Sequence, residues 1–179
     1  AFIQQFNIDP LNVSIETLKH IALEHHNDAW IKEETDKDTL LQWLFSTQIE
    51  PGLGVSNETE AVPCFVYDFP ASQASLAKLN QTNPNVAHRF ELYFKGIELA
   101  NGFFELQDAK EQRQRFEQDN KKRAELNKPV RQIDENLLAS LKSGLPECSG
   151  VALGIDRLIM CALQVSDINQ VISFDITRA

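Results

Sequence analysis

Two glutamates, Glu91 and Glu98, are the residues of this sequence best suited to metal chemistry. They lie in the stretch of residues 89–105, where charged and apolar residues alternate as they do in a strand with one solvent-facing side. Two carboxylates that share one face of a sheet repel each other unless a cation lies between them. Because Mg²⁺ is commonly held by one or two carboxylates together with phosphate oxygens, the pair predicts a magnesium site that also accepts phosphate.

A β-hairpin is the element that must position this pair. Lys95 and Gly96 interrupt the alternating pattern and have the composition of a tight two-residue turn. With these residues in the turn, Glu91 and Glu98 become diagonal neighbours on one face of the hairpin, roughly 7–8 Å apart at the backbone. That spacing allows both carboxylates to converge on one ion.

Asn101 and Glu105 fall on the face opposite Glu98, because successive side chains of a strand alternate between its two faces. Bringing all three residues to one site requires a frame shift, and we expect a bulge at residues 100–102 to supply it. The alternative is a surface hairpin whose acids are solvated, since charged residues mostly lie outside. The Asn-Gly pair within an apolar strand argues against that alternative, because it weakens the strand without an evident packing reason.

A second candidate site lies at residues 150–160, where the pattern indicates a buried strand that runs through Gly154 into a helix. A glycine there lets a ligand approach the backbone, and the start of a helix offers N–H groups to an anion. Arg157 lies in the first turn, where its guanidinium is suited to gripping phosphate, and Asp156 is better placed to favour the helix start. The alternative for Arg157 is an ordinary surface ion pair. Together with the acidic hairpin, the segment predicts a nucleotide site.

Composition limits the class of protein. The 179 residues, 42% of them hydrophobic, suffice for one well-buried core and one domain. The net charge of -9 opposes non-specific binding to nucleic acid. Three cysteines without a Cys-x-x-Cys pair fit a reducing compartment, and no apolar run reaches the length of a membrane span. We expect a cytoplasmic protein.

Helices and strands alternate without a regular βαβ rhythm, which favours an α+β fold with an antiparallel sheet flanked by helices. Residues 64–69 form an expected strand, and residues 72–79 an expected helical turn or two. The sequence predicts four helices, each beginning at a capping residue. These caps are Ser14, Asp38, Asp108 and Asp134, the last for a helix that Gly144 ends.

At these residues the sequence resembles the class II aminoacyl-tRNA synthetases, specifically their lysine branch. Residues 90–92 and 96–106 resemble the branch's acidic and amino-acid-binding segment, and residues 154–157 resemble the third motif of the class. Within the branch, a paralogue family that modifies elongation factor P is the most similar in sequence at three segments, residues 69–76, 114–120 and 148–157. The resemblance covers essentially the whole chain. It implies the C-terminal portion of a catalytic domain, with residues 1–60 a mainly helical insertion and residues 61–179 the sheet and third-motif region.

The resemblance also implies roles for individual residues, with ATP and Mg²⁺ as cofactors. Glu91 and Glu98 would hold the metal, while Asn101, Glu105 and Ala152 would contact the amino acid. The residues that would contact ATP are Glu98, Leu99, Gly154 and Arg157, of which Arg157 is catalytic and holds the γ-phosphate. The implied reaction activates (R)-β-lysine or lysine as an acyl-adenylate and transfers it to a lysine side chain of elongation factor P. Neither direct nucleic-acid binding nor a membrane is expected.

Two departures from the family pattern bear on function. Ala152 stands where true lysyl-tRNA synthetases typically carry glycine, and its methyl group should disfavour α-lysine while leaving room for a β-amino group. Nothing in the chain matches the first motif, which builds a homodimer interface in the family, or the second, whose arginine holds the α-phosphate. We therefore expect the full-length protein to be a homodimeric enzyme and this piece alone to be inactive. The alternatives are a piece of a true lysyl-tRNA synthetase and a non-catalytic synthetase-like module.

Overall fold

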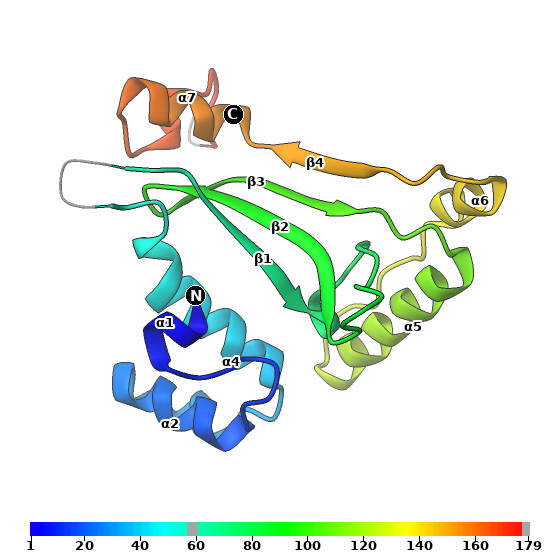
Figure 1. Cartoon of the computed structure of the whole chain (residues 1–179), viewed down its shortest axis with the longest axis horizontal. Helices are drawn as coiled ribbons and strands as arrows, with labels where there is room; N and C mark the ends of the chain where they lie inside the picture. Colours follow the sequence, from blue (N-terminus) through cyan, green and yellow to red (C-terminus); the bar gives the residue numbers. More distant parts are fainter. Residues whose placement is uncertain (57–60, 177–179) are drawn as a thin grey trace. The chain divides into compact units, whose positions relative to one another are not determined.

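The fold is α+β, as the sequence predicted, with a four-stranded antiparallel sheet flanked by helices (Figure 1). The computed structural model describes residues 1–56 and 61–176. The strands follow one another across the sheet in the order β1-β2-β3-β4. Their bounds are Cys64–Pro70 for β1, Val86–Phe94 for β2, Ile97–Phe104 for β3 and Ser149–Leu153 for β4.

The chain forms two compact units, and each unit is assembled from separate stretches of sequence. The first unit contains Ala1–Tyr67, Phe90–Asn101 and Val151–Ala179. The second contains Asp68–Arg89 and Gly102–Gly150. Because the chain passes between the units several times, no single linker divides it.

The first unit begins with a helical cluster whose members pack on a leucine-rich core (Figure 1). Ser14 caps one helix as predicted, because its Oγ accepts a hydrogen bond from the Thr17 N–H at 3.1 Å. The cap assigned to Asp38 is wrong by two residues: Asp36 is the cap and accepts from the Asp38 N–H. The helices are α1 (Phe2–Phe6), α2 (Ile15–His25), α3 (Ala29–Glu33) and α4 (Lys37–Leu44). Their buried core residues are Leu18, Ala22, Ile31, Leu40, Leu41 and Leu44.

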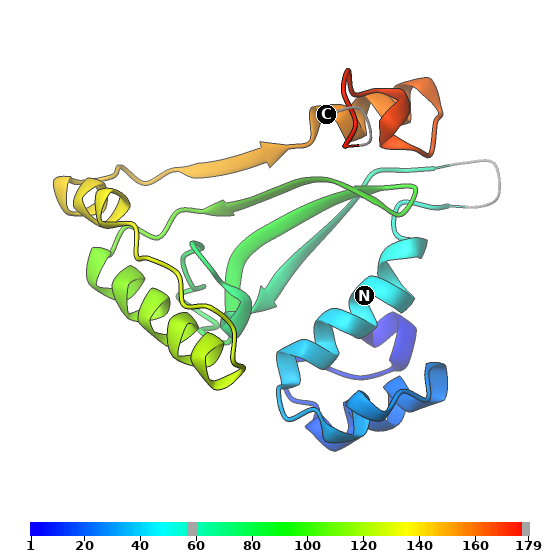
Figure 2. The ribbon, with the colours of Figure 1, turned by 180° about the vertical axis from the view of Figure 1, so that it is seen from behind.

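The second unit carries two further helices, α5 (Ala109–Glu125) and α6 (Glu135–Ser143), which pack on each other (Figure 2). Asp108 and Asp134 cap them as predicted, and Gly144 follows α6 with a φ of 102° that favours glycine. The expected helical turns at residues 72–79 are limited to one 3₁₀ turn, η3 (Ala71–Gln73). A turn at residues 75–76 follows it, and Ala77 and Leu79 then form isolated β-bridges in place of a helix.

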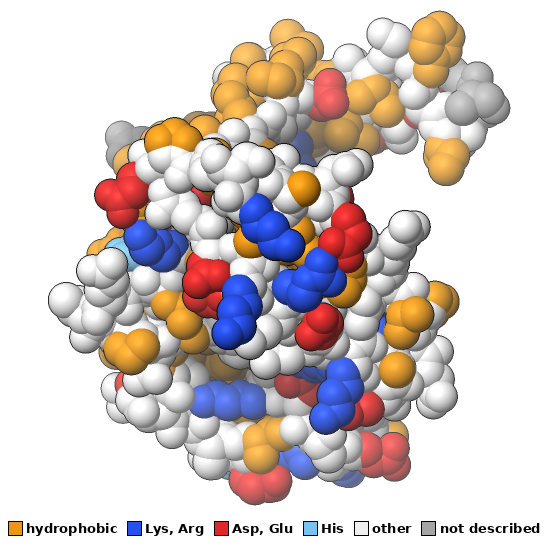
Figure 3. All heavy atoms as spheres, turned by 90° about the vertical axis from the view of Figure 1, so that its right-hand side faces the viewer, with side chains coloured by type: hydrophobic (Ala, Val, Ile, Leu, Met, Phe, Trp, Pro, Cys, Tyr) orange, Lys and Arg blue, Asp and Glu red, His pale blue; other side chains and the backbone are white. Residues whose placement is uncertain are grey.

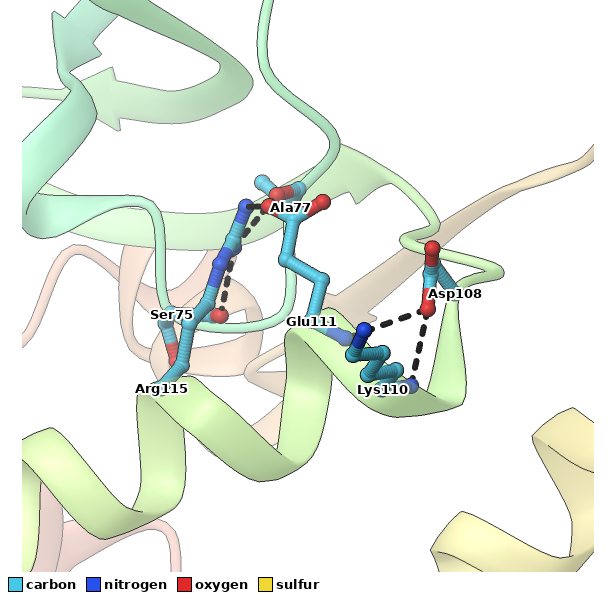
Figure 4. Close-up of polar contacts among 6 residues, drawn as sticks. All are labelled: Ser75, Ala77, Asp108, Lys110, Glu111 and Arg115. Atoms are coloured by element: carbon cyan, nitrogen blue, oxygen red, sulfur yellow. Dashed lines mark hydrogen bonds and ion pairs between the residues drawn. The ribbon is translucent and has the colours of Figure 1, made fainter.

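Arg115 of α5 contacts the backbone of this segment at Ser75 and Ala77 (Figure 4). Its Nη1 donates to the backbone carbonyls of Ser75 at 2.9 Å and Ala77 at 2.8 Å, and its Nη2 pairs with Glu111 one turn earlier on the helix. Ser75 has a φ of 52°, in the left-handed region that non-glycine residues seldom adopt. The arginine thus adds two hydrogen bonds from a charged group to a backbone that also forms β-bridges at Ala77 and Leu79.

The last part of the first unit contains the predicted strand and helix, but the strand is not buried as predicted. Val151 and Leu153 of β4 are exposed, as are Ile155 and Leu158 of the following helix, α7 (Ile155–Leu163). No element in residues 1–56 and 61–176 covers these side chains, which the apolar pattern alone does not reveal. Within residues 1–56 and 61–176, no helix is both long and apolar enough to span a membrane.

Around α5 and α6, acidic and basic side chains are interspersed rather than gathered by sign (Figure 3). Arg113 of α5 and Glu135 of α6 form an ion pair between the two helices. This face therefore lacks the continuous basic surface by which proteins neutralise a nucleic-acid backbone. All three cysteines are free thiols.

Candidate functional site

The predicted hairpin is present, and its turn has the expected conformation. Lys95 and Gly96 have φ angles of 53° and 71°, and two positive φ angles define the type I′ turn typical of two-residue hairpins. The turn packs on the backbone of residues 51–54, since the Gly96 N–H donates to the Leu53 carbonyl at 2.8 Å. A Cβ on Gly96 would lie 2.8 Å from the carbonyl oxygen of Pro51, so glycine is required there for contact as well as for conformation.

Glu91 lies inside the first unit, with 6% of its surface exposed, and two neighbours orient its carboxylate. The Tyr93 hydroxyl donates to Oε2 at 2.6 Å, and the Asn101 side-chain amide donates to Oε1 at 2.8 Å. Burial raises the pKa of the Tyr93 hydroxyl far above its usual value, and the hydrogen bond to Glu91 raises it further. The carboxylate is therefore held in one orientation by two donors.

The contact between Asn101 and Glu91 requires the frame shift that the sequence predicted. A regular ladder from the two-residue turn would place Asn101 on the face opposite Glu91. The 2.8 Å hydrogen bond between their side chains is incompatible with that register. Leu99 and Ala100 are both buried although they are adjacent in β3, which also breaks the strict alternation of a regular strand.

Glu98 and Arg157 meet, although 59 residues separate them in sequence. Arg157 Nη1 donates to the Glu98 carbonyl at 2.8 Å and lies 3.4 Å from the Glu98 carboxylate oxygen Oε2. The two side chains are 48% and 31% exposed, so this ion pair remains open to solvent and to a ligand. The structure thus brings an acid of the hairpin and the guanidinium of α7 together.

Glu50 is a third acid of the same unit, and the sequence analysis did not identify it. It opens the 3₁₀ turn η2 (Glu50–Gly52), which follows the π-helical turn η1 (Phe45–Ile49) and leads into the backbone that contacts the hairpin turn. Burial raises the pKa of the Glu50 carboxyl above its usual value. The negative charges of Glu98 and Glu91 also raise this pKa, and the positive charge of Arg157 opposes them. No sequence motif pointed to Glu50, because only the packing of residues 51–54 on the turn brings it near.

Gly154 precedes α7 and has an ordinary backbone conformation. Its N–H donates to the Leu99 carbonyl at 2.8 Å, which ties α7 to β3. A Cβ on Gly154 would lie no closer than 3.5 Å to the side chain of Arg157 and 3.6 Å to the Leu99 oxygen, both ordinary contacts. Packing within this chain therefore does not require glycine at position 154. Leu99 itself is buried, whereas Ala152 and Asp156 are exposed.

Glu105 belongs to the second unit and is half-buried there. Its N–H donates to the Cys148 carbonyl at 3.0 Å, which joins the end of β3 to the segment before β4. A Cβ built on Gly150 would lie only 2.4 Å from the Glu105 carboxylate oxygen Oε1. The absence of a side chain at position 150 thus leaves the space that this carboxylate occupies.

The described residues contain no group of three or more His, Cys, Asp or Glu side chains arranged to hold a metal ion. A site for Mg²⁺ in the first unit would accordingly use one or two carboxylates and depend on oxygens from another molecule, as Mg²⁺ sites in nucleotide-binding proteins do. A shallow pocket of about 380 Å³ in the second unit lies between residues 78–84 and 106–111. It contains none of the predicted site residues.

Comparisons with known proteins agree with the sequence resemblance. Residues 9–178 match the family model for tRNA synthetases class II (D, K and N). The chain is 54% identical over its whole length to the elongation factor P–(R)-β-lysine ligases of Photorhabdus laumondii and Pectobacterium atrosepticum, and 52% identical to that of Proteus mirabilis. In each case it covers 54% of the relative, so it spans about half the length of the curated relatives it matches. The chain belongs to the class II aminoacyl-tRNA synthetase family, in which its relatives are ligases.

Proposed function

We propose that the full-length protein uses ATP to activate (R)-β-lysine or lysine and transfers it to a lysine side chain of elongation factor P. The observation that carries the proposal is the meeting of Glu98 with Arg157 in the unit that also holds the oriented carboxylate of Glu91. An acid and a guanidinium that approach each other while remaining partly exposed, as Glu98 and Arg157 do, are suited to binding a metal-bound phosphate chain. The names of the relatives supply the acyl group and the protein acceptor.

Mg²⁺ fits the residues present. Carboxylate oxygens are its preferred protein ligands, and Glu98 and Glu91 belong to adjacent strands of one unit. We assign the metal to these two residues. When bound, Mg²⁺ would neutralise phosphate charge in the way that metal ions do at phosphoryl groups. Glu50 adds negative charge to the same region, which favours a cation there.

ATP would lie between the hairpin and α7. Arg157 would bind the γ-phosphate, and ligand binding would loosen its 3.4 Å contact with the Glu98 carboxylate. Gly154 would allow the nucleotide to approach the backbone, a role that its exposure to solvent supports. Leu99 would contribute backbone rather than side chain, because its side chain is buried.

The reaction has two steps. In the first step, a carboxylate oxygen of the amino acid attacks the α-phosphorus of ATP and forms a C–O–P linkage. The bond between the α-phosphorus and the oxygen that bridges to the β-phosphate breaks, and pyrophosphate leaves with the electron pair of that bond. The neutral ε-amine of an acceptor lysine then attacks the acyl carbon. An amide bond forms, AMP leaves with the electron pair of the broken C–O bond, and the amine loses a proton to solvent. Glu105 would be the counter-ion of a substrate amino group, and Asn101 would hydrogen-bond the amino acid.

A true lysyl-tRNA synthetase is the second candidate, because the matching family is described by its tRNA synthetases. We take Ala152 to favour the ligase, since a methyl group at this position would narrow the space for an α-amino group. We further propose that the full-length protein is a homodimer and that the chain alone is a weak catalyst.

Mass spectrometry of elongation factor P tests the proposal directly. The full-length protein is incubated with ATP, Mg²⁺ and (R)-β-lysine, and we expect one lysine of elongation factor P to gain the mass of a β-lysyl group. Lysine tRNA in place of elongation factor P serves as the competing acceptor. Charging of the tRNA without modification of elongation factor P would refute the ligase assignment and establish the synthetase. An Arg157→Ala variant, expected to lose the product, links the activity to this site.

A further inference from the structure

Ala77 and Glu105 face each other across a short backbone pairing in the second unit. They form an antiparallel β-bridge, and two hydrogen bonds flank it, one of them from the Leu106 N–H to the Leu76 carbonyl at 2.9 Å. In a pair flanked in this way the two side chains lie on the same face, with their Cα atoms about 4.5 Å apart. The position of the Glu105 side chain therefore depends on where the backbone around Ala77 lies.

The backbone around Ala77 is bound from α5 by Arg115 (Figure 4). Arg115 Nη1 donates to the carbonyl of Ser75 at 2.9 Å and to that of Ala77 at 2.8 Å. The side chain of Arg115 is only 16% exposed, and Glu111 pairs with its Nη2. Hydrogen bonds from a charged donor are stronger than those between neutral groups, and more so where water is largely excluded. Arg115 thus binds the same short segment that pairs with Glu105.

The conformation of Ser75 depends on contacts from outside this segment. Its φ of 52° lies in the left-handed region, which a non-glycine residue adopts mainly where its surroundings favour it. Residues 74–79 belong to no helix and form only isolated β-bridges. The bonds from Arg115 to the carbonyls of Ser75 and Ala77 therefore act directly on this conformation.

We propose that Arg115 is a positioning residue for the amino-acid substrate, because it fixes the backbone that places the Glu105 carboxylate. The inference rests on the proposed function, in which Glu105 is the counter-ion of a substrate amino group, and it adds a residue of α5 that acts through the backbone of residues 75–77. A substitution that shifts a binding group by about 1 Å costs up to ~10²-fold even when it lies far from the chemistry. Because the carboxylate has to meet an ammonium group at hydrogen-bond distance, a small shift of the β-bridge weakens their contact.

The expected effect is confined to one of the two substrates. The contacts that lead from Arg115 to Glu105 all lie in the second unit, whereas every residue proposed to bind ATP or Mg²⁺ belongs to the first. Loss of Arg115 should accordingly weaken the binding of the amino acid and leave the binding of ATP nearly unchanged. A purely structural role predicts a different result, because a smaller folded fraction lowers kcat through fewer active molecules and leaves both KM values unchanged.

The test is an Arg115→Ala substitution in the full-length protein, measured by amino-acid-dependent ATP–pyrophosphate exchange. We expect the KM for (R)-β-lysine to rise about tenfold and the KM for ATP to stay within about twofold of the wild-type value. Arg113→Ala is the matched control, because Arg113 lies on the same helix and pairs with Glu135 of α6 instead of the backbone of residues 75–77. We expect both KM values of this variant to match those of the wild type.

Hydrogen exchange of backbone amides identifies the route of the effect. The N–H groups of Lys78 and Leu106 both donate across the β-bridge, to the carbonyls of Phe104 and Leu76. In Arg115→Ala we expect these two amides to exchange faster than the change in global stability accounts for, and in Arg113→Ala we expect no such change. A raised KM for (R)-β-lysine without faster exchange at these amides would overturn the route through residues 75–77.

An unchanged KM for (R)-β-lysine in Arg115→Ala would overturn the proposal, as would an equal rise of both KM values or the same rise in Arg113→Ala. Should Arg115→Ala fail to fold, Arg115→Lys takes its place, since lysine keeps the charge but lacks the rigid planar donor group. For that variant we expect the KM for (R)-β-lysine to rise roughly threefold, and an unchanged KM would overturn the proposal in the same way.

Exchange by the wild type distinguishes a failure of this inference from a failure of the proposed function. A wild-type protein without exchange activity on lysine or (R)-β-lysine would remove the proposed function, and the role of Arg115 with it. Normal exchange by the wild type, together with an unchanged KM for (R)-β-lysine in the arginine variant, would remove only the role of Arg115.

Discussion

Gly150→Ala offers a sharp test of Glu105 as the amino-acid counter-ion. The added Cβ would lie 2.4 Å from the Glu105 carboxylate oxygen Oε1, whereas ordinary contact begins at 3.4 Å. The oxygen must therefore move by about 1 Å, the difference between these two distances. The carboxylate carbon is 3.6 Å from the added atom, which is already an ordinary contact, so the terminal group can move without displacing the backbone.

A misplacement of about 1 Å in a substrate-binding group costs up to ~10²-fold in catalysis, or about 2.7 kcal/mol. We therefore expect Gly150→Ala in the full-length protein to lower kcat/KM for the amino acid by roughly that factor in ATP–pyrophosphate exchange. The melting temperature should change little, because the group that moves is the flexible end of a side chain. Gly52→Ala is the control, since a Cβ on Gly52 would have no atom within 4 Å.

The result that would refute this reasoning is a folded Gly150→Ala enzyme with an unchanged kcat/KM for the amino acid. Such a result would mean that the position of the Glu105 carboxylate is unimportant for substrate binding. An equal loss of activity in Gly52→Ala would show that the effect comes from the replacement of glycine itself. A change confined to the KM for ATP would assign Glu105 to the nucleotide instead of the amino acid.

Three further predictions concern other residues. In Glu50→Gln, the melting temperature at pH 7 should exceed that of the wild type, because the raised pKa of the Glu50 carboxyl means that its ionised form destabilises the folded state. The difference in melting temperature should fade as the pH falls through this raised pKa, and it should vanish below 4.5, the usual pKa of the group. A difference that persists at low pH would contradict this prediction. Ala152→Gly should raise the activation of α-lysine relative to (R)-β-lysine in the exchange assay, and an unchanged preference would count against a role for the methyl group. Arg115→Ala should lower the free energy of unfolding, measured with urea, by about 3 kcal/mol, because two backbone carbonyls lose a charged hydrogen-bond donor. A loss below ~1 kcal/mol would show that Ser75 and Ala77 keep their conformation without the arginine.

The sequence by itself determined the elements whose causes are local. Lys95 and Gly96 form a two-residue turn because both residues adopt the positive φ angles that such a turn requires. Helix caps are equally local, since each capping side chain bonds an N–H group two or three residues away. The caps predicted correctly are Ser14, Asp108 and Asp134. Even the frame shift around Asn101 followed from counting residues along one strand. Local rules failed where two similar residues compete at short range, as Asp36 and Asp38 do for one cap.

Only the tertiary structure decided which distant groups share the site. Arg157 reaches Glu98 because the Gly154–Leu99 hydrogen bond ties α7 to β3, a contact between segments that no local pattern relates. Glu50 joins the acids for a similar reason, since residues 51–54 pack on the hairpin turn. The exposure of β4 was also decided by the tertiary structure, because an apolar run has the same pattern whether or not another element packs on its side chains. Contacts between distant segments arise only when the whole chain folds, so the spacing of residues along the sequence does not predict them.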